Sequence, residues 1–264
     1  MDAAGPSIDS LPPDLLTSGK NNNHKDRDVG SIYLIRHGQA SFGALDYDVL
    51  SPLGKRQAEI LGAHLSRLGV GFDRCISGSL KRQQHTASAT LEQLHLAGMK
   101  TPAIETDPAF DEINIDAVLQ THLPDLFPAH QDLQRALQQA AAQPSSFQRL
   151  FGQAIEQWIS GKHEKATLES WNSFRERVQD GFNRLLVDAP PQARIAVFTS
   201  GGPIITLLHL IAGISAHRAF EYAWQIANTS FSQLRFQGNV VTLTSFNSHA
   251  HLEMMQTPEL ITYL

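Results

Sequence analysis

The sequence contains a single cysteine, Cys75, among 264 residues. One cysteine excludes an intrachain disulfide, and such scarcity is typical of proteins from a reducing compartment. Residues 1–30 lack the charged start and apolar stretch of a signal peptide. No apolar run approaches the roughly 20 residues that a membrane-spanning helix needs. From these absences we expect a cytoplasmic protein without a membrane partner.

Positive charge is not in excess either. The formal net charge is −5, which gives no overall attraction to nucleic acid or to an anionic membrane. Hydrophobic residues make up 42% and charged residues 18%, as in ordinary globular proteins. We therefore expect no nucleic-acid partner, and any phosphate site must depend on a local cluster of arginines.

The pattern of apolar residues predicts an α/β fold. Apolar runs alternate with segments of helical periodicity, which is typical of a layered single domain with a central, mostly parallel sheet flanked by helices. Residues 1–30 are polar and without period, so we predict a flexible tail followed by one domain at 31–264. Strands are expected at 31–35, 74–77, 104–106, 195–198, 231–236 and 240–246, and helices at 52–69, 79–96, 168–187 and after 203.

One region departs from this alternation. Glutamine and alanine crowd residues 131–148, and three prolines interrupt residues 117–165. The apolar content is too thin for a core of its own, so we interpret 117–165 as a helical insertion rather than a second domain. Insertions at a ligand-binding edge commonly set specificity, but nothing here names a ligand.

Polar residues follow two predicted parallel strands. Arg36 and His37 come directly after the first strand, and Arg82 follows the second in a strand-to-helix turn. This layout brings both arginines to one edge of the sheet, where open α/β sheets place their ligands. Two guanidinium forks match the oxygens of a phosphoryl group. Backbone N–H groups at the start of the helix near Gly202 are expected to add to the pocket.

These motifs, in this order, resemble the histidine phosphatase superfamily, whose fold is that of phosphoglycerate mutase. The resemblance covers roughly Ser31 to Leu252 and thins across the insertion. The chain also resembles a bacterial subgroup with serine in the final motif. The matching segments are Leu34-Ile35-Arg36-His37-Gly38-Gln39, Tyr47 to Gly54, Ser77 to Ala87, Phe110-Asp111-Glu112, Glu169 to Arg177 and Ile195 to Gly202.

The resemblance implies phosphoryl transfer through a phosphohistidine, with no metal and no cofactor. His37 is then the nucleophile, and it needs a neutral imidazole nitrogen. Arg36 and Arg82 stabilise the charge on the transferring group. Glu112 protonates the leaving oxygen and later takes a proton from water.

Several assignments stay open at this point. Asp111 and Asp116 are alternative acids, and Gln39 and Ser41 are auxiliary candidates from the first motif. Gly201, in the final motif, is a candidate for phosphate binding.

The final motif departs from the common family pattern. Ser200 stands where a second histidine is usual, and Gly43 stands where an asparagine is usual. A serine hydroxyl donates one uncharged hydrogen bond, and losing a transition-state donor costs about 10² to 10³ in rate. A slow enzyme is therefore expected. We also consider that His249 or His251 partly replaces the missing imidazole, although surface histidines are the simpler interpretation.

The predicted function is a slow phosphomonoesterase that acts on a small phosphorylated metabolite. The alternatives are a phosphoester-binding or regulatory protein without catalysis and, less favoured, a phosphomutase, since mutases of this family carry the second histidine. Inorganic phosphate is a further expected ligand, and the sequence does not predict an oligomeric state. Asn228-Thr229-Ser230 matches a glycosylation sequon, which we interpret as a chance match.

Overall fold

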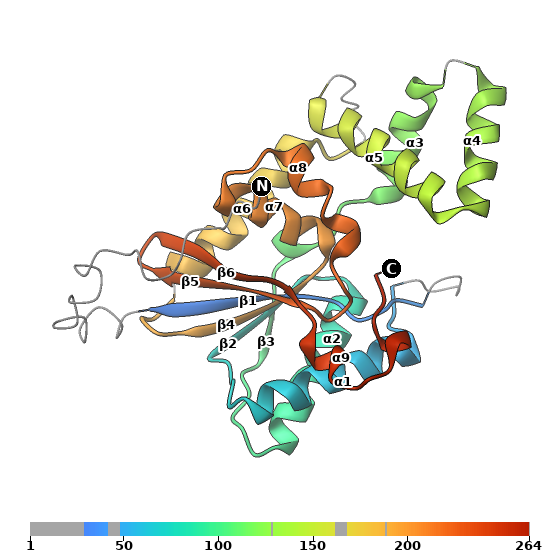
Figure 1. Cartoon of the computed structure of the whole chain (residues 1–264). Coiled ribbons are helices and arrows are strands. Elements are labelled where there is room, and N and C mark those ends of the chain that lie inside the picture. The colour runs from blue at the N-terminus through green and yellow to red at the C-terminus, as the bar shows by residue number, and fades with distance from the viewer. Residues whose placement is uncertain (1–28, 42–47, 128, 162–167, 188, 264) are drawn as a thin grey trace, which may run out of the picture.

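The computed structural model describes residues 29–41, 48–127, 129–161, 168–187 and 189–263. In these residues the centre of the fold is a six-stranded sheet with the strand order β3-β2-β4-β1-β5-β6 (Figure 1). The strands are β1 (Gly30–Arg36), β2 (Arg74–Ser77), β3 (Ile104–Thr106), β4 (Arg194–Thr199), β5 (Phe231–Gln237) and β6 (Val240–Ser248).

Four neighbouring strands of the sheet are parallel, and the last two are antiparallel. Strands β1 and β4 form the centre and read as continuous apolar runs, as parallel strands covered on both faces do. The carboxyl ends of β1, β2 and β4 consequently meet at one edge of the sheet. Arg36, Ser77 and Thr199 are the last residues of these three strands.

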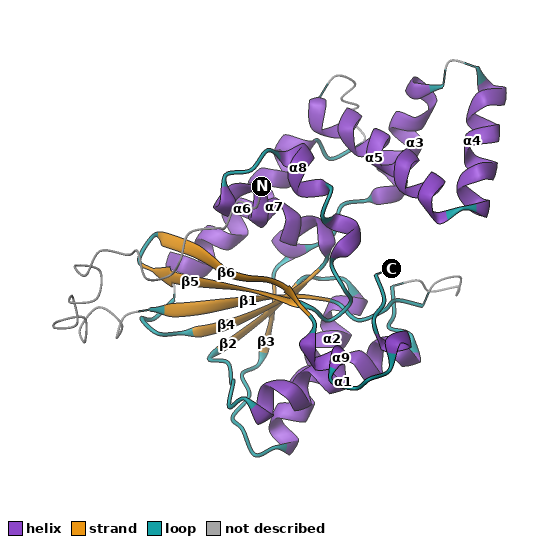
Figure 2. Cartoon of the chain, viewed as in Figure 1, coloured by secondary structure: helices purple, strands orange, loops and turns teal. Residues whose placement is uncertain are grey.

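Helices cover both faces of the sheet (Figure 2). Residues 33, 35, 196 and 198 point to α1 (Pro52–Arg67) and α2 (Lys81–Leu96), while residues 32, 34, 195 and 197 point to α6 (Trp171–Val187) and α7 (Gly201–Ala212). The side-chain period of two in a strand produces this division into two cores. The short elements are α8 (Ala216–Phe220), α9 (Ala250–Glu253) and the 3₁₀ turns Pro108–Phe110, Ala223–Gln225 and Pro258–Leu260.

The range predicted as a helical insertion contains three helices, α3 (Ile115–Leu126), α4 (His130–Ala142) and α5 (Pro144–Ser160). They project from one side of the layered domain (Figure 1). Helix α5 packs on the domain through Trp158, whose ring centroid lies 5.4 Å from that of Trp171 in α6. Its hydrophobic residues therefore join the larger core instead of forming a separate one.

The predicted strands and principal helices are present, with shifts at their ends. Gly30, which we assigned to the tail, begins β1, because it pairs with Phe236 and the aromatic ring covers it. Helix α2 begins at Lys81 instead of residue 79, because Asp111 binds the N–H and hydroxyl of Ser79. The predicted tail at 1–28 lies outside the described residues. No helix in the described part of the chain is both long and apolar enough to cross a bilayer.

Candidate active site

His37 lies directly after β1 and is 5% exposed. Its backbone N–H donates to the carbonyl of Thr199 at the end of β4 (2.9 Å), so the two central strands fix its position. Its Nδ1 lies 2.7 Å from the carbonyl oxygen of Gly38. A carbonyl only accepts hydrogen bonds, so Nδ1 carries the proton and Nε2 presents a lone pair. This is the tautomer that a nucleophilic imidazole needs.

Arg82, in the first turn of α2, faces that lone pair. Its Nε donates to His37 Nε2 at 3.2 Å, and its Nη1 forms an ion pair with Asp48 Oδ1 at 2.6 Å. Burial lowers the pKa of His37 well below its usual value, and the charges of Arg36 and Arg82 lower it further. The imidazole is therefore neutral at physiological pH.

Arg36 is the last residue of β1, and backbone carbonyls orient its guanidinium. Its Nη1 donates to the carbonyl of Ile226 and to the carbonyl of Tyr263, the latter at 2.8 Å. Both contacts come from segments far along the chain. A carbonyl has no net charge, so these bonds orient the cation without neutralising it. Arg36 and Arg82 thus place two positive charges beside the His37 ring.

Glu112 lies in the loop between the 3₁₀ turn Pro108–Phe110 and α3, and its carboxylate contacts the start of α7. Its Oε1 accepts from the N–H of Ile113 at 3.0 Å and from the N–H of Gly202 at 3.1 Å. A Cβ at residue 202 would overlap Glu112 Oε1, so a larger residue there would displace the carboxylate. Gly201, adjacent to it, also borders the carboxylate. We expected N–H groups near Gly202 to add to the pocket; in the structure the Gly202 N–H donates to Glu112.

Ser200 is fully buried and is the N-cap residue of α7. Its hydroxyl oxygen accepts a hydrogen bond from Gln83 Nε2 at 2.8 Å. The same amide nitrogen donates to the carbonyl of Phe110 at 3.1 Å. Gln83 lies beside Arg82 on α2, so one helix contacts both His37 and Ser200.

The comparisons with known proteins show the family and the fold of the chain. The model of the histidine phosphatase superfamily (branch 1) matches residues 32–249, well over half of the chain. The chain belongs to the histidine phosphatase superfamily. The matched range includes the strand ends that carry Arg36, His37 and Ser200, together with Arg82 and Glu112.

The curated relatives of this histidine phosphatase domain are similar over short stretches. It is 39% identical over 67 residues to the mitochondrial serine/threonine-protein phosphatase PGAM5 of Xenopus tropicalis, which is 25% of this chain and 24% of the relative. It is 33% identical over 116 residues to PGAM5 of Mus musculus, 40% of this chain and 39% of the relative. The chain thus matches about a quarter to two fifths of the length of these relatives.

Solved structures of the superfamily share the fold. The phosphoglycerate mutase of Bacillus anthracis has a TM-score of 0.59 at 17% identity, with 89% of this chain and all of that one covered. A phosphoserine phosphatase of Entamoeba histolytica has a TM-score of 0.54 at 18% identity, with 84% and 99% covered. A mycobacterial glucosyl-3-phosphoglycerate phosphatase has a TM-score of 0.55 at 18% identity, with 83% and 99% covered. These similarities support the α/β fold with its central sheet.

Of the alternative acids, neither lies where Glu112 does. Asp111 binds the N–H and hydroxyl of Ser79 and so ties the loop after β3 to the loop after β2. Asp116 is exposed in the first turn of α3. Glu112 is the carboxylate held against the motif that carries Ser200.

The auxiliary candidates of the first motif connect it to α1. Gln39 donates its N–H to Gln57 Oε1 at 2.9 Å, and its own Oε1 accepts from the Ser51 hydroxyl at 2.8 Å. Ser41 donates its N–H to the carbonyl of Val49 at 2.9 Å. These hydrogen bonds of Gln39 and Ser41 position the segment that follows His37. Gly43, the departure from the family pattern, lies outside the described residues.

The two late histidines have partners other than Ser200. His251 is 2% exposed, and its Nε2 lies 3.1 Å from the hydroxyl of Thr229. Burial lowers its pKa to about 3, so it is neutral at physiological pH. His249 contacts the Asn247 carbonyl at 2.8 Å and Glu253 at 3.3 Å. These contacts give no support to a compensating imidazole.

The sequence analysis missed residues that bind the backbone of Arg36 and His37. Asn228 is fully buried, and its Nδ2 donates to the carbonyl of His37 at 3.0 Å. Its Oδ1 accepts from the hydroxyl of Thr262 at 2.8 Å, and Thr229 donates its N–H to the carbonyl of Arg36 at 3.1 Å. The apparent sequon thus packs against the active site, and buried Asn228 is inaccessible as a glycosylation acceptor. The sequon pattern itself does not indicate that Asn228 is buried or that it contacts His37.

The described parts of the chain contain no cluster of metal ligands. No group of three or more histidine, cysteine, aspartate or glutamate side chains there is arranged to hold an ion. The chemistry available to the site comes from an imidazole, two guanidinium groups, a carboxylate and a hydroxyl.

Proposed function

We propose that this protein is a phosphomonoesterase that works through a phosphohistidine on a small phosphorylated metabolite. One observation carries the proposal: the unprotonated Nε2 of buried His37 faces the guanidinium of Arg82 at 3.2 Å. A nucleophilic nitrogen and an anion-binding guanidinium thus face the same position. A dianionic phosphoryl group satisfies both, because its phosphorus accepts the lone pair and its oxygens accept the N–H groups.

In the first step the phosphoryl group moves from the substrate to His37. Phosphoryl oxygens take over the N–H groups of Arg82 and Arg36, which frees the lone pair of His37 Nε2. The bond between Nε2 and phosphorus forms while the bond from phosphorus to the leaving oxygen breaks. The leaving oxygen receives a proton from Glu112. The Gly38 carbonyl accepts from Nδ1–H throughout and stabilises the positive charge that develops on the ring.

The second step reverses the roles. Water attacks the phosphorus, Glu112 takes a proton from that water, and the bond between Nε2 and phosphorus breaks. Inorganic phosphate leaves and His37 returns to its neutral form. Since Glu112 gives one proton and regains one, no metal or other cofactor is needed to balance the cycle.

Ser200 makes the proposed enzyme slow. Its hydroxyl oxygen is occupied as an acceptor by Gln83, so its own proton is available to a phosphoryl oxygen. One neutral donor replaces what a charged imidazole would supply. A deficit of about 10² to 10³ still leaves a large acceleration, because phosphate ester hydrolysis without a catalyst is among the slowest reactions known.

The comparisons support the phosphatase class and suggest two kinds of substrate. Structural neighbours include a phosphoserine phosphatase and a glucosyl-3-phosphoglycerate phosphatase, which by their names act on small phosphate esters. The PGAM5 relatives are named as protein phosphatases. We propose the small ester, and assays with phosphoserine and with a phosphoserine peptide distinguish the two.

Ser200 is also the observation that favours the alternative, a phosphoester-binding protein without turnover. The two functions differ in one measurable respect, since a binding protein retains phosphate esters but releases no inorganic phosphate. Release of phosphate from p-nitrophenyl phosphate by the unmodified protein, at a rate proportional to protein concentration, supports the enzyme.

Ser200→Ala tests the proposed role of the hydroxyl. We expect kcat for p-nitrophenyl phosphate to fall about 10- to 10³-fold, because a donor to the transferring group is lost. Ser230→Ala is the matched control: Ser230 is also buried, and its hydroxyl has no hydrogen-bond partner in the described part of the chain. Equal rates for the two variants would refute a role for Ser200 in catalysis.

A further inference from the structure

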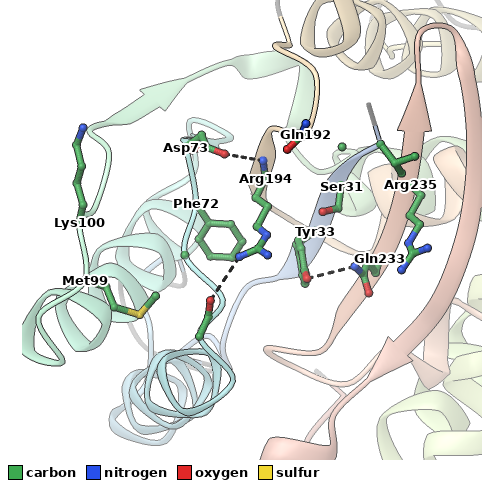
Figure 3. A pocket seen from close by; sticks show the side chains of 14 residues that line it. Ser31, Tyr33, Phe72, Asp73, Met99, Lys100, Gln192, Arg194, Gln233 and Arg235 are labelled. Atoms are coloured by element: carbon green, nitrogen blue, oxygen red, sulfur yellow. Dashed lines mark hydrogen bonds between the residues drawn. The ribbon is translucent and has the colours of Figure 1, made fainter. Parts of the chain in front are cut away.

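A polar cavity lies at the edge of the sheet opposite His37. It opens where β1 and β4 begin, has a volume of about 890 Å³, and is lined chiefly by polar groups (Figure 3). We call it the basal groove. Six of its lining residues carry the argument that follows: Tyr33, Phe72, Lys100, Arg194, Gln233 and Arg235.

The cations of the basal groove have no carboxylate partner among the residues that the structure describes. Most of the charged arginine side chains elsewhere in the described structure pair with an acidic residue, as Arg74 does with Glu105. Within the described residues, no carboxylate lies within 4.0 Å of the charged groups of Lys100, Arg194 or Arg235. Asp73 is the acidic residue of the lining, and its Oδ2 accepts from the backbone N–H of Arg194 at 2.8 Å.

Tyr33 lines the groove together with Arg194 and Arg235. Burial raises the pKa of Tyr33, and the positive charges of the two arginines act in the opposite direction. The Tyr33 hydroxyl accepts from Gln233 Nε2 at 3.2 Å. In Figure 3 Tyr33 and Arg194 lie in the middle of the groove, with Lys100 on one side and Arg235 on the other.

The floor of the groove is made of residues that contact one another. The rings of Tyr33 and Phe72 pack edge to face with centroids 5.5 Å apart, and both are buried. Arg194 is held at its backbone by Asp73 and at its side chain by the Gly69 carbonyl at 3.4 Å. Preorganised donors reduce the ordering cost that binding incurs.

We propose that the basal groove binds a small phosphate-bearing anion at a site separate from the active site. Two guanidinium groups with no carboxylate partner among the described residues, an ammonium group and a phenol match the oxygens of a phosphate or diphosphate. The groove is concave and the whole chain has a net charge of −5, which disfavours a long polyanion such as nucleic acid. The strands β1 and β4 lead from this groove to His37 and Ser200, roughly 20 Å away at about 3.3 Å per residue.

Isothermal titration with imidodiphosphate, an analogue of pyrophosphate that resists hydrolysis, tests the proposal. We expect two binding events per chain in the unmodified protein, one at each site. The variant Arg194→Glu/Arg235→Glu should lose one event, with an affinity at the groove at least about 30-fold weaker, because two charge-assisted contacts become repulsive. Its hydrolysis of p-nitrophenyl phosphate should be unchanged without the ligand.

The control is Arg67→Glu/Arg149→Glu, which changes the net charge equally at two exposed arginines outside the groove. Two events should persist in this variant. Binding in the unmodified protein that persists undiminished in Arg194→Glu/Arg235→Glu would overturn the proposal. An equal weakening in both double variants would overturn it too, since the effect would then come from total charge.

Discussion

His37→Ala is expected to lower kcat/KM for p-nitrophenyl phosphate by at least about 10⁴-fold. The imidazole supplies the atom that bonds to phosphorus, and no other nucleophile takes its place between Arg36 and Arg82 in the proposed mechanism. Only the contribution of binding and charge stabilisation would be left. Steady-state assays over a range of substrate concentrations measure this loss.

His85→Ala is the control for this variant, because His85 is exposed on the same helix as Arg82. It should retain full activity. Circular dichroism in the near ultraviolet checks that His37→Ala keeps its packing, since the residue is 5% exposed. A well-folded His37→Ala variant with activity near that of the unmodified protein would rule out His37 as the nucleophile.

Glu112→Gln is expected to have an effect that depends on the leaving group. An alkyl phosphate such as phosphoserine leaves as a poor alkoxide, so loss of the acid should lower its kcat/KM by about 10² to 10⁴-fold. The leaving group p-nitrophenolate needs little protonation, so the rate with p-nitrophenyl phosphate should fall far less in the step that forms phosphohistidine. Comparing kcat/KM for the two substrates measures the difference.

The substitution is conservative in structure. A glutamine amide oxygen can still accept from the N–H groups of Ile113 and Gly202, as the carboxylate does. The controls are Asp111→Asn and Asp116→Asn, the two alternative acids. If either of these produces the loss specific to phosphoserine, or if Glu112→Gln slows both substrates equally, then Glu112 is not the general acid.

The sequence predicted the parts of the site that follow from local patterns. Apolar runs identified β1 and β4, and the rule that parallel strands end at one edge placed Arg36 and Arg82 near each other. The hydrogen bond between Arg82 and His37 fits that expectation. Family motifs then singled out Glu112 and Ser200 within the same edge.

The sequence did not predict contacts between residues far apart along the chain. Asn228 and Tyr263 reach the first motif across about two hundred residues, through a buried amide and a backbone carbonyl. Such bonds leave no periodicity in the sequence, because a single amide or carbonyl has no spacing to detect. The partnership of Gly202 with Glu112 was missed for a related reason: a helix start binds whichever acceptor the fold brings to it.

The central claim is a covalent bond between His37 Nε2 and phosphorus. The most direct test mixes the unmodified protein with p-nitrophenyl phosphate, quenches within the first turnovers at alkaline pH, where phosphohistidine survives, and maps the peptides by mass spectrometry. We predict one added phosphoryl group on the peptide that contains His37, more of it in Glu112→Gln if hydrolysis of the intermediate is slowed more than its formation, and none in His37→Ala. Steady turnover with no phosphoryl group on His37 at any time point, or with the group on another residue, would contradict the account.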